Sequence, residues 1–425
     1  FFGEYDESYL SLPEEVLITS MREHQRYFPV FENEEKEKLL PYFISVRNGD
    51  KQALDKVIAG NEKVLRARLA DGRFFYDEDR ASSIEEAMDK LKNVVFQEEH
   101  GTVYDKAKRV QEIAKKISEQ LKVTTEEKEA VERAALIGKF DLVTNMVNEF
   151  PELQGIMGEK YALHFGEEKA VAEAVKDHYK PLHSTDSLPT TKVSSIVSVA
   201  DKLDTIVGTI SVGLIPTGSQ DPYGLRRQAI GLLRIMLEKE WEVAFESFLS
   251  YAKELYDLAN YEESLVNFFK DRAVYIFSQE NIEHDIIKAV LHDEIGVLSY
   301  KFKKAKLLSE KRNDANFKLA QESFVRVLNL AKKAGASKVE PAYFETESEK
   351  KLYERFTLVE ENFHKLEAKL AAEEALHELV SLAEPIHDFF ENNMVMDPDE
   401  KIKENRLSLV YDIANLIKQY ADLTL

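Results

Sequence analysis

The stretch GLIPTGSQDPYGLRRQAIGLLRIM, residues 213–236, joins a polar, turn-forming run to a segment of helical periodicity. Asp221 suits the N-cap of a helix, because its carboxylate can accept hydrogen bonds from the free amides of the first turn. Pro222 suits the first helical position, where no amide hydrogen is needed, and Gly218 suits a turn with positive φ. Apolar residues recur at helical spacing from Leu225 onward. The stretch therefore predicts a loop that leads into an amphipathic helix.

The paired Arg226 and Arg227 stand at the start of that helix. They are not part of a Walker loop, because the Gly-x4-Gly-Lys-Ser/Thr pattern is absent. Neighbouring helical residues point about 100° apart, so both guanidinium groups cannot reach one phosphate without bending their stems. Two interpretations stay open: a face that contacts phosphate, and a face that is solvated or paired inside the protein.

The composition around this stretch limits the possible functions. Apolar residues make up 44% and charged residues 32% of the 425 positions, which is typical of a helix-rich globular chain. No run approaches the roughly 18 apolar residues of a spanning helix, so we expect no membrane segment. The lack of cysteine excludes disulfides and sulfur-based zinc sites, and it suits a reducing cytoplasm. A net charge of −21 excludes a globally basic nucleic-acid binder, so RNA binding would require locally concentrated cations.

The hydrophobic pattern changes along the chain and predicts four parts. Residues 1–80 predict a small α+β segment, in which EEVLITSM and YFPVFE are short strands or a strand–helix pair. Residues 81–242 predict a helical domain, 243–311 a helical connector, and 312–425 a bundle with helices near 314–334, 345–379, 379–392 and 397–420. The chain begins within a strand pattern and without Met, so we expect it to be the C-terminal part of a longer polypeptide.

Three segments of the second part have the order of a metal site. They are AALIGKFDLV (134–143), VKDHYKP (175–181) and VSVADKLDTIVG (197–208). This order resembles the HD superfamily of phosphohydrolases, in which imidazoles and carboxylates hold divalent metals that activate water. The residues that match it are Asp141, His178 and Asp201.

One ligand of that pattern is missing, because Phe140 stands where the His of the His-Asp pair would be. His100 is a weak match for another position. We therefore expect a degenerate site without a metal, whose polar residues serve as buried hydrogen-bond partners. A surviving metal-dependent phosphohydrolase is the alternative.

Longer blocks identify a second resemblance that covers essentially the whole chain in order. They are SLPEEVLITSMREHQRYFPVF, YFISVRNGD, GNEKVLRARLADGRFFYDEDR, FDLVTNMVNEFPELQGIMGEKYAL, ADKLDTIVGTISVGLIPTGSQDPYGLRRQAIGLLRI and FFENNMVMDPDEKIKENRLSLVYDIANLIKQYADLTL. Together they closely resemble the β subunit of bacterial glycyl-tRNA synthetase, the α2β2 type. That subunit is longer, and the resemblance implies that an N-terminal portion of roughly a third is absent here.

The resemblance implies a function that the residues alone do not establish. The family's assembly attaches glycine to its tRNA through glycyl-adenylate, with ATP and Mg in the α subunit. The β subunit is expected to bind the anticodon and acceptor arms of glycine tRNA. It is also expected to contain a degenerate HD domain and a C-terminal anticodon-binding bundle, with no cofactor in this fragment.

Clusters of cationic and aromatic residues are the candidate RNA contacts. The segment YKFKKAKLLSEKR (300–312) carries Lys301, Lys303, Lys304, Lys306, Lys311 and Arg312, and the next cations are Arg326, Lys332, Lys333 and Lys338. In the bundle we add Phe324, Phe389, Phe390, Asn393 and Arg406, and near the start His24, Arg26 and Tyr27. Lysines would neutralise phosphates, and aromatic or arginine planes would stack on unpaired bases. A solvated helix face and a purely structural helical scaffold remain the alternatives.

Overall fold

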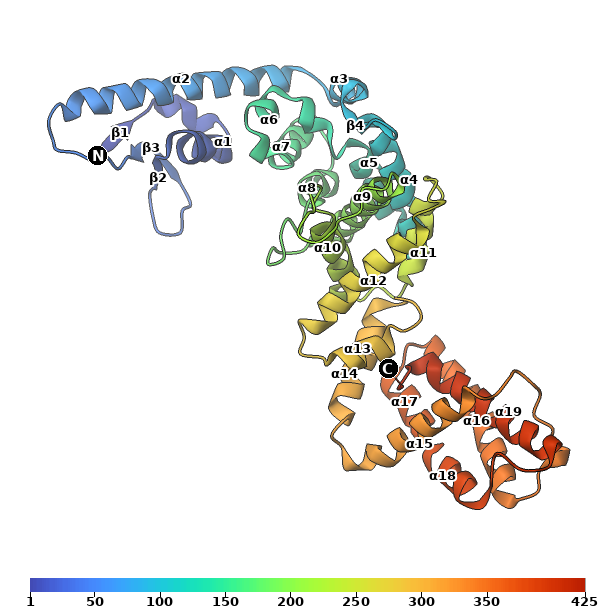
Figure 1. Cartoon of the computed structure of the whole chain (residues 1–425). Coiled ribbons are helices and arrows are strands. Elements are labelled where there is room, and N and C mark those ends of the chain that lie inside the picture. Colours follow the sequence, from blue (N-terminus) through green and yellow to red (C-terminus); the bar gives the residue numbers. More distant parts are fainter. Residues whose placement is uncertain (425) are drawn as a thin grey trace. The chain divides into compact units, whose positions relative to one another are not determined.

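The computed structural model describes residues 1–424 and is mainly helical, with small sheets near the N-terminus, as the sequence predicts (Figure 1). The chain forms two compact units, Phe1–Gly208 and Thr209–Leu425. The division falls inside the helical domain that we expected at 81–242, within α9 (Lys192–Ser211). The finer division into four parts stays a prediction. No helix among the described residues is both long and apolar enough to cross a membrane.

The first unit begins with a three-stranded antiparallel sheet of order β1-β3-β2. Its strands are β1 (Phe2–Glu4), β2 (Phe28–Phe31) and β3 (Leu39–Ile44), and the segment EEVLIT forms α1 (Glu14–Thr19) rather than a strand. Phe2 and Phe28 both pair with Ile44, while Gly3 and Pro29 pair with Phe43. Because side chains alternate along a strand, Phe43 lies on the core face, and Phe2 and Phe28 lie on the opposite, exposed face.

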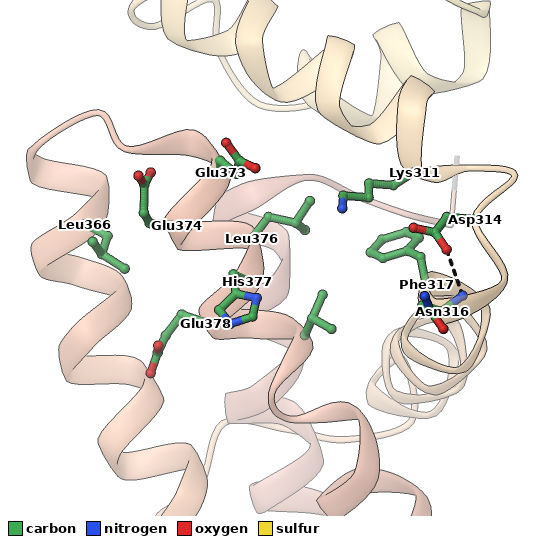
Figure 2. A pocket seen from close by; sticks show the side chains of 11 residues that line it. Lys311, Asp314, Asn316, Phe317, Leu366, Glu373, Glu374, Leu376, His377 and Glu378 are labelled. Atoms are coloured by element: carbon green, nitrogen blue, oxygen red, sulfur yellow. Dashed lines mark hydrogen bonds between the residues drawn. The ribbon is translucent and has the colours of Figure 1, made fainter.

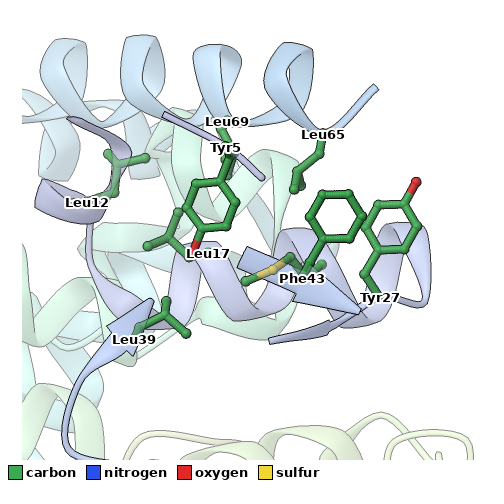
Figure 3. Packing of buried hydrophobic residues seen from close by; sticks show 9 residues of the cluster. Tyr5, Leu12, Leu17, Tyr27, Leu39, Phe43, Leu65 and Leu69 are labelled. Atoms are coloured by element: carbon green, nitrogen blue, oxygen red, sulfur yellow. The ribbon is translucent and has the colours of Figure 1, made fainter. Parts of the chain in front are cut away.

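The core of the sheet is completed by α2 (Leu54–Ala81), as Figure 3 shows. Leu65 and Leu69 of α2 are fully buried against Phe43 and its neighbours. Tyr27 stacks on Phe43, with the ring centroids 4.5 Å apart. Tyr27 is therefore a core residue.

The rest of the first unit is mainly helical and includes one two-stranded sheet, β4-β5. Its elements are α3 (Ile84–Lys90), β4 (Val95–Gln97), β5 (Gly101–Thr102), α4 (Val103–Gln120), α5 (Thr125–Ile137), α6 (Asn145–Glu149), α7 (Ile156–His164) and α8 (Lys169–Asp177), followed by α9. Ser83 caps α3 by accepting a hydrogen bond from the amide of Glu86, three residues further along the chain.

The second unit consists of helices from α10 onward. They are α10 (Leu225–Glu238), α11 (Phe245–Lys253), α12 (Glu262–Ser278), α13 (His284–Val290), α14 (Leu298–Lys311), α15 (Ala315–Ala331), α16 (Glu347–Ala368), α17 (Ala372–Val380), α18 (Ala383–Asn392) and α19 (Glu400–Tyr420). The helix predicted at 345–379 is in fact two helices, because Leu370 adopts a positive φ of 56° between α16 and α17.

The start of α10 corrects one prediction. The helix begins at Leu225, after Gly224 in the left-handed conformation, so Pro222 is not its first residue. Asp221 lies in the preceding turn, yet its carboxylate accepts the amides of Leu225 and Arg226, each at 2.9 Å. Asp221 therefore satisfies the free amides as expected, from one turn further back. Gly218 has the predicted positive φ.

Candidate functional site

A largely buried lysine, whose side chain is 14% exposed, lies among the residues of the suspected metal site. The Nζ atom of Lys139 is 3.0 Å from Nε2 of His178 and 3.2 Å from Oδ2 of Asp201. It also lies 4.0 Å from the centre of the Tyr179 ring. Lys139 follows α5, His178 caps α8 and Asp201 lies in α9, so this amine joins three helical segments.

The protonation state of His178 follows from its contacts. Burial, and then the positive charge of Lys139, lower the pKa of His178 to about 3, so the ring is neutral near pH 7. Its Nδ1 lies 2.7 Å from the carbonyl oxygen of Val175, to which it donates its proton. The lone pair of Nε2 is then left to accept a hydrogen bond from Lys139.

Asp201 is ionised and is shared by two lysines. Burial acts to raise the pKa of Asp201, but Lys139 and Lys106 hold it well below its usual value. Lys106 donates to Asp204 at 3.0 Å and lies 3.4 Å from Oδ1 of Asp201. Arg109 donates to the other oxygen of Asp204 at 2.8 Å. Helices α4 and α9 are thus joined by a network of buried charges.

Asp141 accepts hydrogen bonds from backbone amides at the start of α7. Its Oδ2 accepts the amides of Gly155 at 2.7 Å and Gly158 at 2.9 Å. Burial raises the pKa of Asp141 to about 6, and these two amides oppose the rise. Phe140 is buried, and His100 contacts the carbonyl oxygen of Gly208.

These positions do not fit a metal. Within residues 1–424 no three His, Cys, Asp or Glu side chains converge as a metal site would require. The donor atoms of His178 and Asp201 already bind an amine. The geometry therefore gives no support to the alternative of a metal-dependent phosphohydrolase, which would require an ordered ligand shell with an open position.

The candidate residues near the N-terminus have separate environments. His24 lies 3.5 Å from Glu152 and contacts the edge of Phe150, so it packs between elements of the first unit. Arg26 is exposed and has a positive φ of 58°. Of the two, Arg26 offers its charge to solvent.

Helical phase divides the lysines of α14 into two sets. Lys301 and Lys304 are only 7% and 2% exposed. Lys301 donates to Asp293 at 2.8 Å, and Lys304 donates to Glu367 at 2.9 Å. We therefore withdraw both residues as phosphate contacts, because their charges are used inside the unit.

Two of the other lysines of this segment are exposed, and Lys311 is partly buried. Lys303 and Lys306 are exposed, whereas Arg312 is paired with Asp285 and Glu283. Only part of the basic run in the sequence is therefore available to a polyanion.

Arg406 is also an internal residue. It is 5% exposed, and its guanidinium donates to Glu349 at 3.0 Å and to the carbonyl oxygen of Met394 at 2.6 Å. Asn393 donates to the carbonyl oxygen of Phe389 and to Ser348. We withdraw Arg406 as a direct tRNA contact, since both residues brace the loop between α18 and α19.

The aromatic candidates of the bundle belong to its core. Phe324, Phe389 and Phe390 are buried, so none presents an open ring face as a stacking platform. Arg326 is exposed, and its guanidinium carbon lies 4.2 Å from the centre of the Phe390 ring. This contact orients a planar cation at the surface.

Three further lysines lie at and after the end of α15. Lys332, Lys333 and Lys338 are all exposed, and Lys332 donates to the side chain of Asn329 at 3.3 Å. The following segment is fixed to α19, because Glu340 and Asn405 exchange hydrogen bonds of 2.7 and 3.1 Å. The segment that carries these lysines is therefore attached to α19 at its C-terminal end.

Arg226 and Arg227 differ in exposure. Arg226 is half-buried near Arg272, whose pKa is lowered by burial and by like charge, and Arg227 is exposed. The geometry keeps Arg227 as an accessible cation.

The cavity in Figure 2 has the wrong charge for RNA. It encloses about 570 Å³ within the second unit. The carboxylates of Glu373, Glu374 and Glu378 lie on one wall, and Lys311 and Asp314 lie across from them. Four carboxylates against one lysine would repel phosphate, so this cavity is not a nucleotide site.

Comparison with known proteins separates the chain into two matched regions. Residues 1–292 match the family described as glycyl-tRNA synthetase beta subunit. The chain belongs to this family. Residues 320–424 match the DALR anticodon binding domain, which begins eight residues after the expected start of the bundle at 312.

Individual members of the glycyl-tRNA synthetase beta-subunit family are similar over the whole chain. The glycine–tRNA ligase beta subunit of Oceanobacillus iheyensis is 51% identical over 100% of the chain. Those of Halalkalibacterium halodurans and Bacillus subtilis are 46% and 44% identical over 99% of it. The chain spans 61–62% of the length of these relatives.

The sequence analysis did not identify Lys139 and Lys106, the two lysines that contact Asp201. The only signal at Lys139 was a lysine within the apolar run AALIGKFDLV. Lys106 lies in α4, which precedes all three segments of the suspected metal site in the sequence. Neither position is distinguishable from an exposed lysine until the helices are packed.

Proposed function

We propose that this chain is the tRNA-recognising part of a glycine–tRNA ligase β subunit. The observation that carries the proposal is the match of residues 320–424 to an anticodon-binding domain, behind a region that matches the β subunit. The relatives are named glycine–tRNA ligase beta subunits, and their similarity covers nearly the whole chain. In this proposal the chain binds glycine tRNA at its anticodon and acceptor arms.

The chemistry of aminoacylation lies in a separate chain under this proposal. An α subunit binds ATP and Mg²⁺, forms glycyl-adenylate, and associates with the β subunit in a cytoplasmic α2β2 assembly. The β subunit contributes affinity and selectivity for the tRNA. Its helical centre around Lys139 is structural.

The exposed cations of the second unit support the RNA-binding half of the proposal. They are Arg227, Lys303, Lys306, Arg326, Lys332, Lys333 and Lys338. The chain as a whole carries a charge of −21, so binding depends on these local cations rather than on a general attraction. Each phosphate that is neutralised releases counterions, and the affinity should therefore fall steeply as salt is added.

A gel-shift titration across a salt series tests the proposal. The 425-residue chain is titrated with glycine tRNA and with the same tRNA carrying a swapped anticodon. We expect binding that weakens with salt and that is tighter for the native anticodon. Salt-independent binding, or equal affinity for both tRNAs, would contradict anticodon recognition by the bundle.

Hydroxyl-radical footprinting distinguishes the remaining alternative. A tRNA-binding bundle protects the anticodon arm of glycine tRNA, whereas a purely structural scaffold leaves the arm fully cleaved. Adding the α subunit should then give glycylation only in the complete assembly.

A further inference from the structure

The charged centre of the first unit contains a cation of its own. The amine of Lys139 donates to His178 and to Asp201, and it faces the ring of Tyr179. An imidazole nitrogen and a carboxylate oxygen that face one point are the ligands that Zn²⁺ and similar ions take in proteins. In this chain the amine of Lys139 occupies that point.

The hydrogen bonds of His178 show why a metal cannot share the position. A neutral imidazole has one lone pair in the plane of its ring. Because Nδ1 donates to Val175, that lone pair belongs to Nε2, and it accepts from Lys139 at 3.0 Å. A metal at about 2.1 Å from Nε2 would need the same lone pair and would overlap the amine.

The surrounding charges also oppose a second cation. Lys106 lies 3.4 Å from Asp201, and the buried amine of Lys202 donates to Ser198 at 2.7 Å and to the carbonyl oxygen of Lys180 at 3.1 Å. A divalent ion would therefore enter a region that already contains three ammonium groups. In a buried site such like-charge repulsion is weakly screened.

We propose that Lys139 is a built-in cation that takes the place of a metal and joins α5, α8 and α9, so that the first unit requires no metal and binds none at this centre. The ammonium supplies one positive charge and directed N–H bonds to His178 and Asp201. It lacks the open coordination position that activates water. This inference does not depend on whether the chain binds tRNA.

Metal binding by the unaltered chain is the first test. Hydrogen exchange of peptides covering α8 and α9 is measured in EDTA and with added Zn²⁺, Mn²⁺ or Ni²⁺. We expect the same exchange in every condition and no metal retained after dialysis. One equivalent of retained metal, with slower exchange in α8 and α9, would overturn the proposal.

Substitution of Lys139 is the second test. Lys139→Met removes the charge but keeps most of the apolar stem, so Asp201 loses one of its buried partners. We expect exchange in α8 and α9 to be faster by about a hundredfold, as for a buried pair that loses one member.

Lys128→Met is the matched control, because Lys128 lies on α5 and pairs with Glu119 at the surface. Its effect on the same peptides should stay below about threefold. If Lys139→Met changed exchange no more than Lys128→Met, the amine would have no structural role and the inference would fail. If Lys139→Met did not fold, the metal test on the unaltered chain would still decide.

Discussion

Helix α14 and the segment that follows α15 both contain several lysines, yet the two regions use them differently. In α14, Lys301 and Lys304 are buried against Asp293 and Glu367. After α15, Lys332 and Lys333 extend into solvent. The difference arises because α14 is packed between α10, α13 and α17, whereas α15 ends at this point. A basic run in a sequence is therefore a binding surface only where no neighbouring helix covers it.

The two buried charge clusters, around Lys139 and around Arg406, also differ from each other. Around Lys139, several lysines share a few carboxylates that lie mainly on one helix, α9. Around Arg406, one guanidinium joins the first turn of α16 to the loop before α19. Both arrangements fix helices, but the second also fixes a surface loop.

The largest effect should come from removing Arg406. Arg406→Ala leaves the carboxylate of Glu349 buried without its partner, and we expect the free energy of unfolding to fall by about 3–5 kcal/mol. Urea denaturation followed by circular dichroism measures the loss. Lys401→Ala, at an exposed position of the same helix, should change the free energy by less than about 0.5 kcal/mol. Equal midpoints for the two variants would refute an interior role for Arg406.

A smaller loss should follow Lys304→Met, because the methionine retains part of the apolar stem. We expect about 3 kcal/mol, from the unpaired charge of Glu367. The salt dependence of tRNA binding should stay unchanged, because the buried amine of Lys304 cannot reach a phosphate of the tRNA. A flatter salt dependence in this variant would show that Lys304 reaches RNA after all.

The exposed pair should show the opposite pattern. Lys332→Ala with Lys333→Ala should leave the unfolding midpoint unchanged and weaken tRNA binding about tenfold at physiological salt. The slope of log affinity against log salt should decrease by about one to two. Lys365→Ala, an exposed lysine of α16 paired with Glu361, serves as the control. If the double variant retained the original slope, the end of α15 would not be part of the interface.

The smallest effect concerns Arg312 and depends on pH. Its hydrogen bond to Asp285 holds the pKa of that carboxyl below 3.8. The pair therefore stabilises the fold above this pH. The stabilisation is lost as the pH falls through the lower pKa of Asp285 in the folded state. Both side chains are partly exposed, so Arg312→Ala should cost less than about 1 kcal/mol at pH 7. Thermal unfolding should show the difference between wild type and variant shrinking below pH 3.8. A difference that grew in acid would contradict this assignment.

Local patterns were sufficient for much of the fold. The predicted positive φ of Gly218 and the predicted capping of helix amides by Asp221 are present, because these features depend on residues close in sequence. The break between α16 and α17 was not predicted, since Leu370 takes a left-handed conformation that its side chain does not favour. The start of α10 was misplaced by three residues, because Asp221 can satisfy the helix amides from within a turn.

The candidate site was less predictable than the fold. The degenerate metal site that Phe140 indicated stays a prediction, which rests on the phenyl ring having no ligand atom. The residue that occupies the centre, Lys139, is its direct neighbour in sequence, and its direction depends on how α5 ends. Among the proposed RNA contacts, sequence density did not distinguish Lys303 from Lys304.

The sequence by itself determined the helical class, the absence of disulfides, the anionic character and the family, because composition and long ordered blocks are properties of the chain. The tertiary structure alone decided which charges are interior and which are accessible. A charged side chain is buried only when partners compensate its lost hydration, and in three pairs of this chain the partner comes from a distant segment. Lys139 and Asp201, Lys304 and Glu367, and Arg406 and Glu349 meet that condition only after the helices have packed.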